Sequence, residues 1–195
     1  MSTVQHIEIV RDQGTAQAVH PKKFIVWLFI VSIVMLFAGL TSAYIVRQAD
    51  GNWVRFNLPS VFWVTSGLIV LSSFTMQMAY RSAAKNNLKN LKLFITATMV
   101  LGLLFLAGQY YSWVQLVHQD VFLVGNPSGS FIYILTGLHG AHLVSGLVFL
   151  LAVLIASFKY KVHSKNLVSI EMCSTYWHFL GGLWIYLFIF LNIYH

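Results

Sequence analysis

Five long apolar runs alternate with short polar segments along this 195-residue chain. They span residues 24–46, 58–80, 93–117, 131–158 and 167–194. Each run reaches the roughly 20 residues that an α-helix needs to cross about 30 Å of hydrocarbon. A membrane-spanning strand would need only about 10 residues, with strict alternation of apolar and polar positions. Because lipid cannot satisfy free backbone groups, the pattern predicts an all-α membrane protein with five transmembrane helices.

The composition supports one membrane domain. Hydrophobic residues make up 58% of the chain and charged residues only 9%, whereas about a quarter of the residues in a soluble domain are charged. We assign residues 23–195 to the five-helix domain. Residues 1–22 are mixed polar and lack the apolar segment of a secretory signal, which predicts a cytoplasmic N-terminal tail.

The basic residues are divided unequally between the two sides of this domain. Ten lysines and arginines lie in the tail and in the loops after the second and fourth runs, and only Arg47 and Arg55 lie on the opposite side. Short cytoplasmic loops are enriched in basic residues, so the N-terminus is predicted to be cytoplasmic and the C-terminus outside. The same distribution explains the net charge of +7 without nucleic-acid binding.

Two of the runs contain ionisable side chains. The fourth includes the segment TGLHGAH, with His139 and His142, and the fifth includes EMCSTYWH, with Glu171 and His178. Ionisable groups within a membrane are costly and mark functional-site hypotheses. Residues three or seven apart share a helical face, so each pair is predicted to face protein. On helices that run in opposite directions, His142 and His178 reach similar depths and could couple directly or through water.

Four interpretations fit these groups. The histidines could form hydrogen bonds between helices, ligate haem as in the membrane anchor of a dehydrogenase, relay protons, or line a solute pathway. A haem site needs facing imidazoles at matched depth, and a second set of ligands is missing. The small residues Gly137, Ala141 and Ser145 recur every four positions, which favours close helix packing.

The motifs resemble a known family. The segment TGLHGAHLVSG is similar to the histidine-glycine-histidine segment of subunit III of haem-copper terminal oxidases. In the last helix of that family, a glutamate is followed six and seven residues later by tryptophan and histidine, as are Glu171, Trp177 and His178. The first run resembles the first helix of the five-helix bacterial forms, and the segment LSSFT with Gln109 extends the similarity over about residues 20–195.

The resemblance implies a non-catalytic subunit III of a proton-pumping terminal oxidase, of the cytochrome c oxidase type, in the respiratory chain of a bacterial inner membrane. Subunit III of a quinol oxidase is the alternative. No redox cofactor is expected in this chain, and haem and copper are expected in partner subunits. The implied partners are subunit I, other oxidase subunits, bound phospholipid and a respiratory supercomplex. The implied role is to stabilise subunit I, bind lipid and support proton uptake.

Three positions depart from the family pattern. Ile33, Ser112 and Gly181 stand where many relatives carry acidic residues. Glu171 is thereby left as the only buried acid, for which we predict a structural or proton-entry role. The histidines are predicted to form hydrogen bonds between helices. The candidate site residues are Glu171, His139, His142, His178, Trp177 and Gln109.

Overall fold

The computed structural model describes residues 21–51, 53–54, 56, 58–158 and 167–194. These residues contain five helices: α1 (Pro21–Ala49), α2 (Val61–Ala84), α3 (Leu88–His118), α4 (Pro127–Phe158) and α5 (Val168–Tyr194). All five are long and apolar enough to cross a membrane, which confirms the predicted fold class. The predicted tail, residues 1–22, lies outside the described residues except for its last two positions, which begin α1.

The helices differ in length from the apolar runs. Helix α3 begins five residues before its run, because the helix continues through Lys89 and Lys92 beyond the apolar part. Helix α2 begins three residues after its run does, since Pro59 lies in the preceding loop. Helix α4 begins at Pro127, where a missing N–H costs nothing. The apolar runs therefore predict the presence of each helix, but they do not predict where the helix begins.

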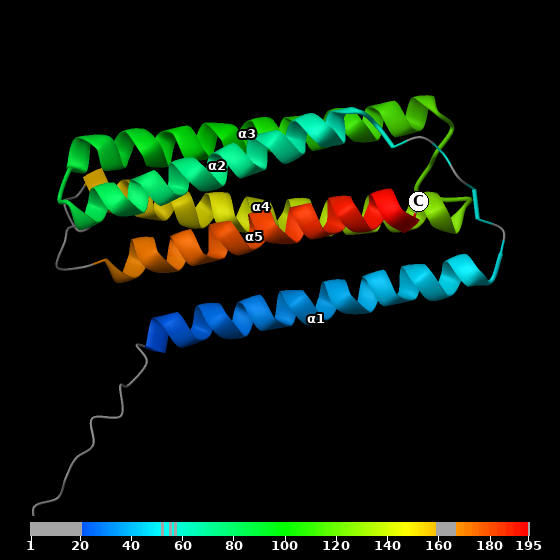
Figure 1. Ribbon diagram of the computed structural model, residues 1–195, viewed down its shortest axis with the longest axis horizontal. Coiled ribbons are helices and arrows are strands. Elements are labelled where there is room, and N and C mark those ends of the chain that lie inside the picture. The colour runs from blue at the N-terminus through cyan, green and yellow to red at the C-terminus, as the bar shows by residue number, and fades with distance from the viewer. Residues whose placement is uncertain (1–20, 52, 55, 57, 159–166, 195) are drawn as a thin grey trace, which may run out of the picture.

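Four of the helices form a ring, and α1 lies outside it (Figure 1). Helices α2, α3, α4 and α5 each pack against the next, and α5 closes the ring against α2. Among the described residues, α1 packs only against α4 and α5 and does not contact α2 or α3. Helix α1 is thus an addition to one side of a four-helix bundle.

Two tryptophans of α5 fill the centre of the ring. The indole of Trp184 meets the phenyl groups of Phe62 and Phe105 edge-on, with centroids 5.7 and 5.0 Å apart. The ring of Trp177 lies against Gly102 and the adjacent turn of α4. Both indoles are buried, so they join helices whose backbones do not touch across the ring.

Glycines permit close approach at positions other than the predicted ones. A Cβ at Gly102 would lie 2.8 Å from the Trp177 ring, and a Cβ at Gly108 would lie 2.5 Å from the Thr65 methyl group. A Cβ at Gly137 would make only ordinary contacts with Trp113. Ala141 and Ser145 are exposed. The tightest helix contacts therefore lie outside the expected stripe of α4, although the Ser145 hydroxyl lies 2.8 Å from the Tyr176 hydroxyl of α5.

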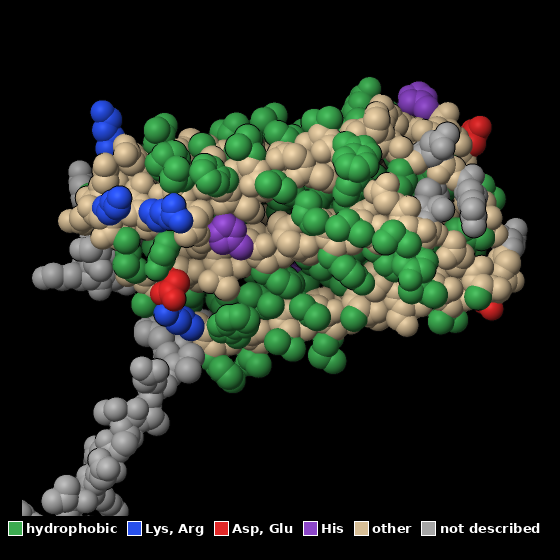
Figure 2. All heavy atoms as spheres, viewed as in Figure 1, with side chains coloured by type: hydrophobic (Ala, Val, Ile, Leu, Met, Phe, Trp, Pro, Cys, Tyr) green, Lys and Arg blue, Asp and Glu red, His purple; other side chains and the backbone are tan. Residues whose placement is uncertain are grey.

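The two ends of the bundle differ in charge. Figure 2 shows lysine and arginine side chains gathered at one end and hydrophobic side chains spread over the helices between. We call the end that carries Lys23 and the α2–α3 loop the basic end. The end that carries Arg47, Asp50 and Asp120 is the far end. Lys159, Lys161 and Lys165, which enter the predicted orientation, lie outside the described residues.

Candidate functional site

The histidine of α4 nearer the far end lies in the centre of the ring. His139 is 0% exposed, and its ring centroid lies 5.9 Å from that of Phe105 and 5.2 Å from that of Trp184. Neither ring nitrogen has a hydrogen-bond partner among the described residues. The predicted hydrogen bond between helices is therefore wrong for His139, which packs instead among aromatic rings of α3 and α5.

The second histidine of α4 faces a different neighbour. His142 Nδ1 donates to the backbone carbonyl of Leu138 within α4, at 2.7 Å. Its ring lies against Phe37 and Phe29 of α1, with centroids 5.8 and 6.3 Å away. The shared face predicted for the two histidines is wrong, and His142 bonds within its own helix.

The histidine of α5 contacts α2. His178 Nε2 donates to Gln77 Oε1 at 3.3 Å, a hydrogen bond between helices of the predicted kind. His142 lies against α1 and His178 against α2, so the predicted coupling of these two side chains is wrong. The three imidazoles point toward different helices and do not face one another as a haem would require.

The acid of α5 lies at the basic end and not in the bundle interior. Glu171 Oε1 accepts from Lys23 Nζ at 2.7 Å, and 41% of the glutamate side chain is exposed. The prediction of a buried acid is corrected, because the α5 helix begins only three residues earlier at Val168. The ion pair joins the first turn of α5 to the first turn of α1.

The remaining candidates form polar contacts inside the ring. Trp177 Nε1 donates to Ser72 Oγ at 3.1 Å, and Gln109 Nε2 donates to Thr65 Oγ1 at 3.2 Å. The hydroxyl groups of α2 thus bind side chains of both α3 and α5. Such bonds between membrane helices are each worth about 0.6–2 kcal/mol, and they specify which faces meet.

One central residue was absent from the predicted site. Trp184 Nε1 donates to Ser66 Oγ at 3.0 Å, and its ring contacts His139. A sequence signal was present, because Trp177 and Trp184 are seven residues apart and so share one face of α5.

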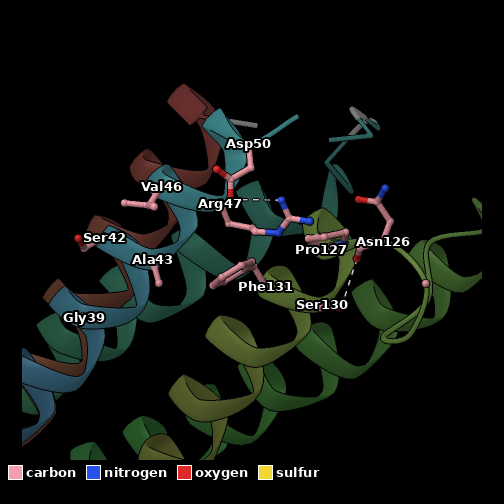
Figure 3. Close-up of a pocket in the computed structure, with 11 residues that line it drawn as sticks. Gly39, Ser42, Ala43, Val46, Arg47, Asp50, Asn126, Pro127, Ser130 and Phe131 are labelled. Atoms are coloured by element: carbon pink, nitrogen blue, oxygen red, sulfur yellow. Dashed lines mark hydrogen bonds and ion pairs between the residues drawn. The ribbon is translucent and has the colours of Figure 1, made fainter. Parts of the chain in front are cut away.

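An open groove runs between α1 and α4 at the far end (Figure 3). Its volume is about 760 Å³, and the small residues Gly39, Ser42 and Ala43 form part of its α1 wall. The Arg47 side chain points across the groove toward Pro127 at the start of α4. Its guanidinium donates to Asp50 at 3.4 Å, and both side chains are exposed. The groove therefore combines small and apolar lining residues with an ion pair at its rim.

The described residues bring together no group of three His, Cys, Asp or Glu side chains that could hold a metal ion. Cys173 is a buried free thiol. Among the described residues, the polar side chains in the bundle interior bond one helix to another.

The similarity of this chain to known proteins extends over all five helices. The family model described as Cytochrome c oxidase subunit III matches residues 9–195. A Nocardia farcinica relative, named probable cytochrome c oxidase subunit 3, is 37% identical over 170 residues, which cover 84% of this chain and 82% of the relative. A Corynebacterium diphtheriae relative, named cytochrome c oxidase subunit 3, is 30% identical over 83% of this chain and 82% of its own. A Staphylococcus saprophyticus relative, named probable quinol oxidase subunit 3, is 30% identical over 83% of each chain.

Proposed function

Because this chain belongs to the cytochrome c oxidase subunit III family, we propose that it is the non-catalytic third subunit of a proton-pumping oxidase that stabilises subunit I. The family match over nearly the whole chain carries this proposal. The polar contacts support it, because they join helices of the bundle to one another. Haem and copper belong to the partner subunits, and membership in a respiratory supercomplex is part of the same proposal.

We also propose the orientation and the membrane. The basic end faces the cytoplasm and the far end faces the periplasm of a bacterial inner membrane. The unequal distribution of lysine and arginine supports this orientation.

Copurification tests the function. An affinity tag on this chain should recover subunits I and II together with haem, while the chain expressed alone should show no Soret band. A Soret band from the isolated chain would favour the haem-anchor alternative and contradict the proposal. Uptake of a solute into vesicles that contain only this chain would favour a transporter.

The electron donor separates the two oxidase candidates. The Nocardia and Corynebacterium relatives carry the cytochrome c oxidase name, and the Staphylococcus relative carries the quinol oxidase name. We favour cytochrome c. The purified complex should consume oxygen with reduced cytochrome c, and turnover with a quinol alone would support the second candidate.

The groove at the far end is our proposed phospholipid site. Its small-residue wall admits an acyl chain, and Arg47 can pair with a headgroup phosphate (Figure 3). A basic side chain near the membrane surface contributes about 1 kcal/mol to the binding of an anionic lipid. Arg47→Gln should therefore weaken retention of anionic lipid about fivefold, measured by mass spectrometry of the purified complex.

A matched pair of variants tests the groove. Asp50→Asn should strengthen lipid retention, because it removes the carboxylate that pairs with Arg47. Arg81→Gln, at the opposite end of the bundle, should leave retention unchanged. Equal lipid content in the Arg47→Gln and wild-type complexes would contradict the proposed site.

Glu171 is our proposed proton-entry residue. Glu171→Gln should leave assembly intact, because a partly exposed ion pair contributes at most about 1 kcal/mol, but should shorten sustained turnover. Lys23→Gln breaks the same ion pair and keeps the carboxylate. If both variants lose turnover equally in oxygen-consumption assays, the ion pair matters and the carboxylate does not.

A further inference from the structure

Two buried polar side chains inside the ring have hydrogen-bonding capacity that no described residue uses. These atoms are both ring nitrogens of His139 and the Oε1 atom of Gln109. Both side chains are almost fully buried. Burying a polar group without a partner is costly, and nearly all such groups in folded proteins are bonded to protein or to ordered water. The three free atoms therefore indicate a missing partner.

The two side chains belong to one layer of the ring. The His139 ring lies against Phe105 of α3, and Gln109 follows Phe105 by one turn, about 6 Å along the same face. On the other side, the His139 ring lies against Trp184, whose indole donates to Ser66 of α2. The neighbouring residue of α2, Thr65, accepts from Gln109. His139 and Gln109 thus lie on two sides of the same cluster.

We propose that this layer holds an ordered water molecule bridging His139 and Gln109. A neutral imidazole offers one donor and one acceptor, whereas the Gln109 Oε1 atom offers only an acceptor. Water can donate to Gln109 and bond one His139 nitrogen at the same time. Buried waters usually make about three hydrogen bonds. The Thr136 hydroxyl, one turn before His139 on α4, donates to Ile132 and accepts from Trp113, and its second lone pair can accept from the water.

Water fits the chemistry better than a cation does. A metal site would need several imidazole, thiolate or carboxylate ligands, and the described residues gather no such group around His139. A neutral histidine and an amide oxygen suit water, which is small and can both donate and accept hydrogen bonds. The bridge would tie α3 to α4 at a depth where lipid offers no hydrogen bonds.

A density map of the intact oxidase at a resolution that shows waters tests the proposal directly. A peak within hydrogen-bonding distance of a His139 nitrogen and of the Gln109 side-chain oxygen supports it. A dry layer overturns it, and so does a direct hydrogen bond between the two side chains.

A double-mutant cycle gives a second test. We compare the half-time of subunit loss from the complex in detergent for His139→Phe, Gln109→Leu and the double variant. If one water bridges the two side chains, the double variant should lose the subunit no faster than the less stable of the two single variants. Fold-changes that multiply overturn the proposal. His139→Phe combined with Thr98→Val is the control, since Thr98 bonds Thr75 about three turns from Gln109, and there the fold-changes should multiply.

Discussion

Trp177→Ala is expected to release the subunit from the purified oxidase at temperatures where the wild-type subunit stays bound. Truncating a buried tryptophan costs about 3–5 kcal/mol in soluble cores. Lipid is as apolar as the bundle core, so the lost packing and the cavity remain as the main terms, at about 2 kcal/mol or more. The change also leaves the Ser72 hydroxyl without its indole donor.

Two further tryptophan variants separate packing from hydrogen bonding. Trp177→Phe keeps most of the ring volume and loses only the N–H, so its effect should be about 1 kcal/mol. Trp27→Ala removes a side chain that is 57% exposed on the outside of α1 and should change little. Subunit retention after stepwise heating in detergent measures all three, and equal retention of the Trp177→Ala and Trp27→Ala complexes would contradict the central role of this indole.

Gly102→Val is expected to destabilise the ring of helices α2–α5 by overpacking it, whereas Trp177→Ala leaves a cavity. A Cβ at this position would lie 2.8 Å from the Trp177 ring and 2.9 Å from the Leu147 side chain. The indole is rigid and held by Ser72, so it cannot move aside freely. Overpacking of this kind costs about 1–3 kcal/mol, which should lower the temperature of subunit loss.

A second glycine gives the matched control. Gly182 lies on α5, and a Cβ there would meet no described atom within 4 Å. Gly182→Val should therefore leave subunit retention close to that of the wild type. If Gly102→Val and Gly182→Val behave alike, the close contact between α3 and α5 does not limit stability.

The helices could be predicted from the sequence, but the directions of their polar side chains could not. Membrane length and apolar composition suffice for the five helices. The segments TGLHGAH and EMCSTYWH mark the polar residues because ionisable groups are rare in lipid. Residues three apart are separated by about 60° around a helix. That difference turns His139 toward α3 and α5 and His142 toward α1.

The central indole of Trp184 was missed for a related reason. Its spacing from Trp177 places both indoles on one face of α5, but the spacing does not show which helices that face meets. Its partners Ser66 and Phe105 come from two other helices, and no local pattern connects them to α5. Glu171 was predicted to be buried because it lies inside an apolar run, but it lies in the first turn of α5, where it pairs with Lys23.

The position of α1 outside the ring has a consequence for biogenesis. The partners of α1 lie on α4 and α5, which are synthesised last, and Glu171 follows Lys23 by 148 residues. At about 5–20 residues per second, α1 would remain in the bilayer for about 7–30 s before its ion-pair partner is made. During that interval its inner face, including Ile33 and Phe37, is available to lipids, to the insertion machinery or to another nascent chain. Among the five described helices, α1 is therefore made first, and both of its neighbours are made last.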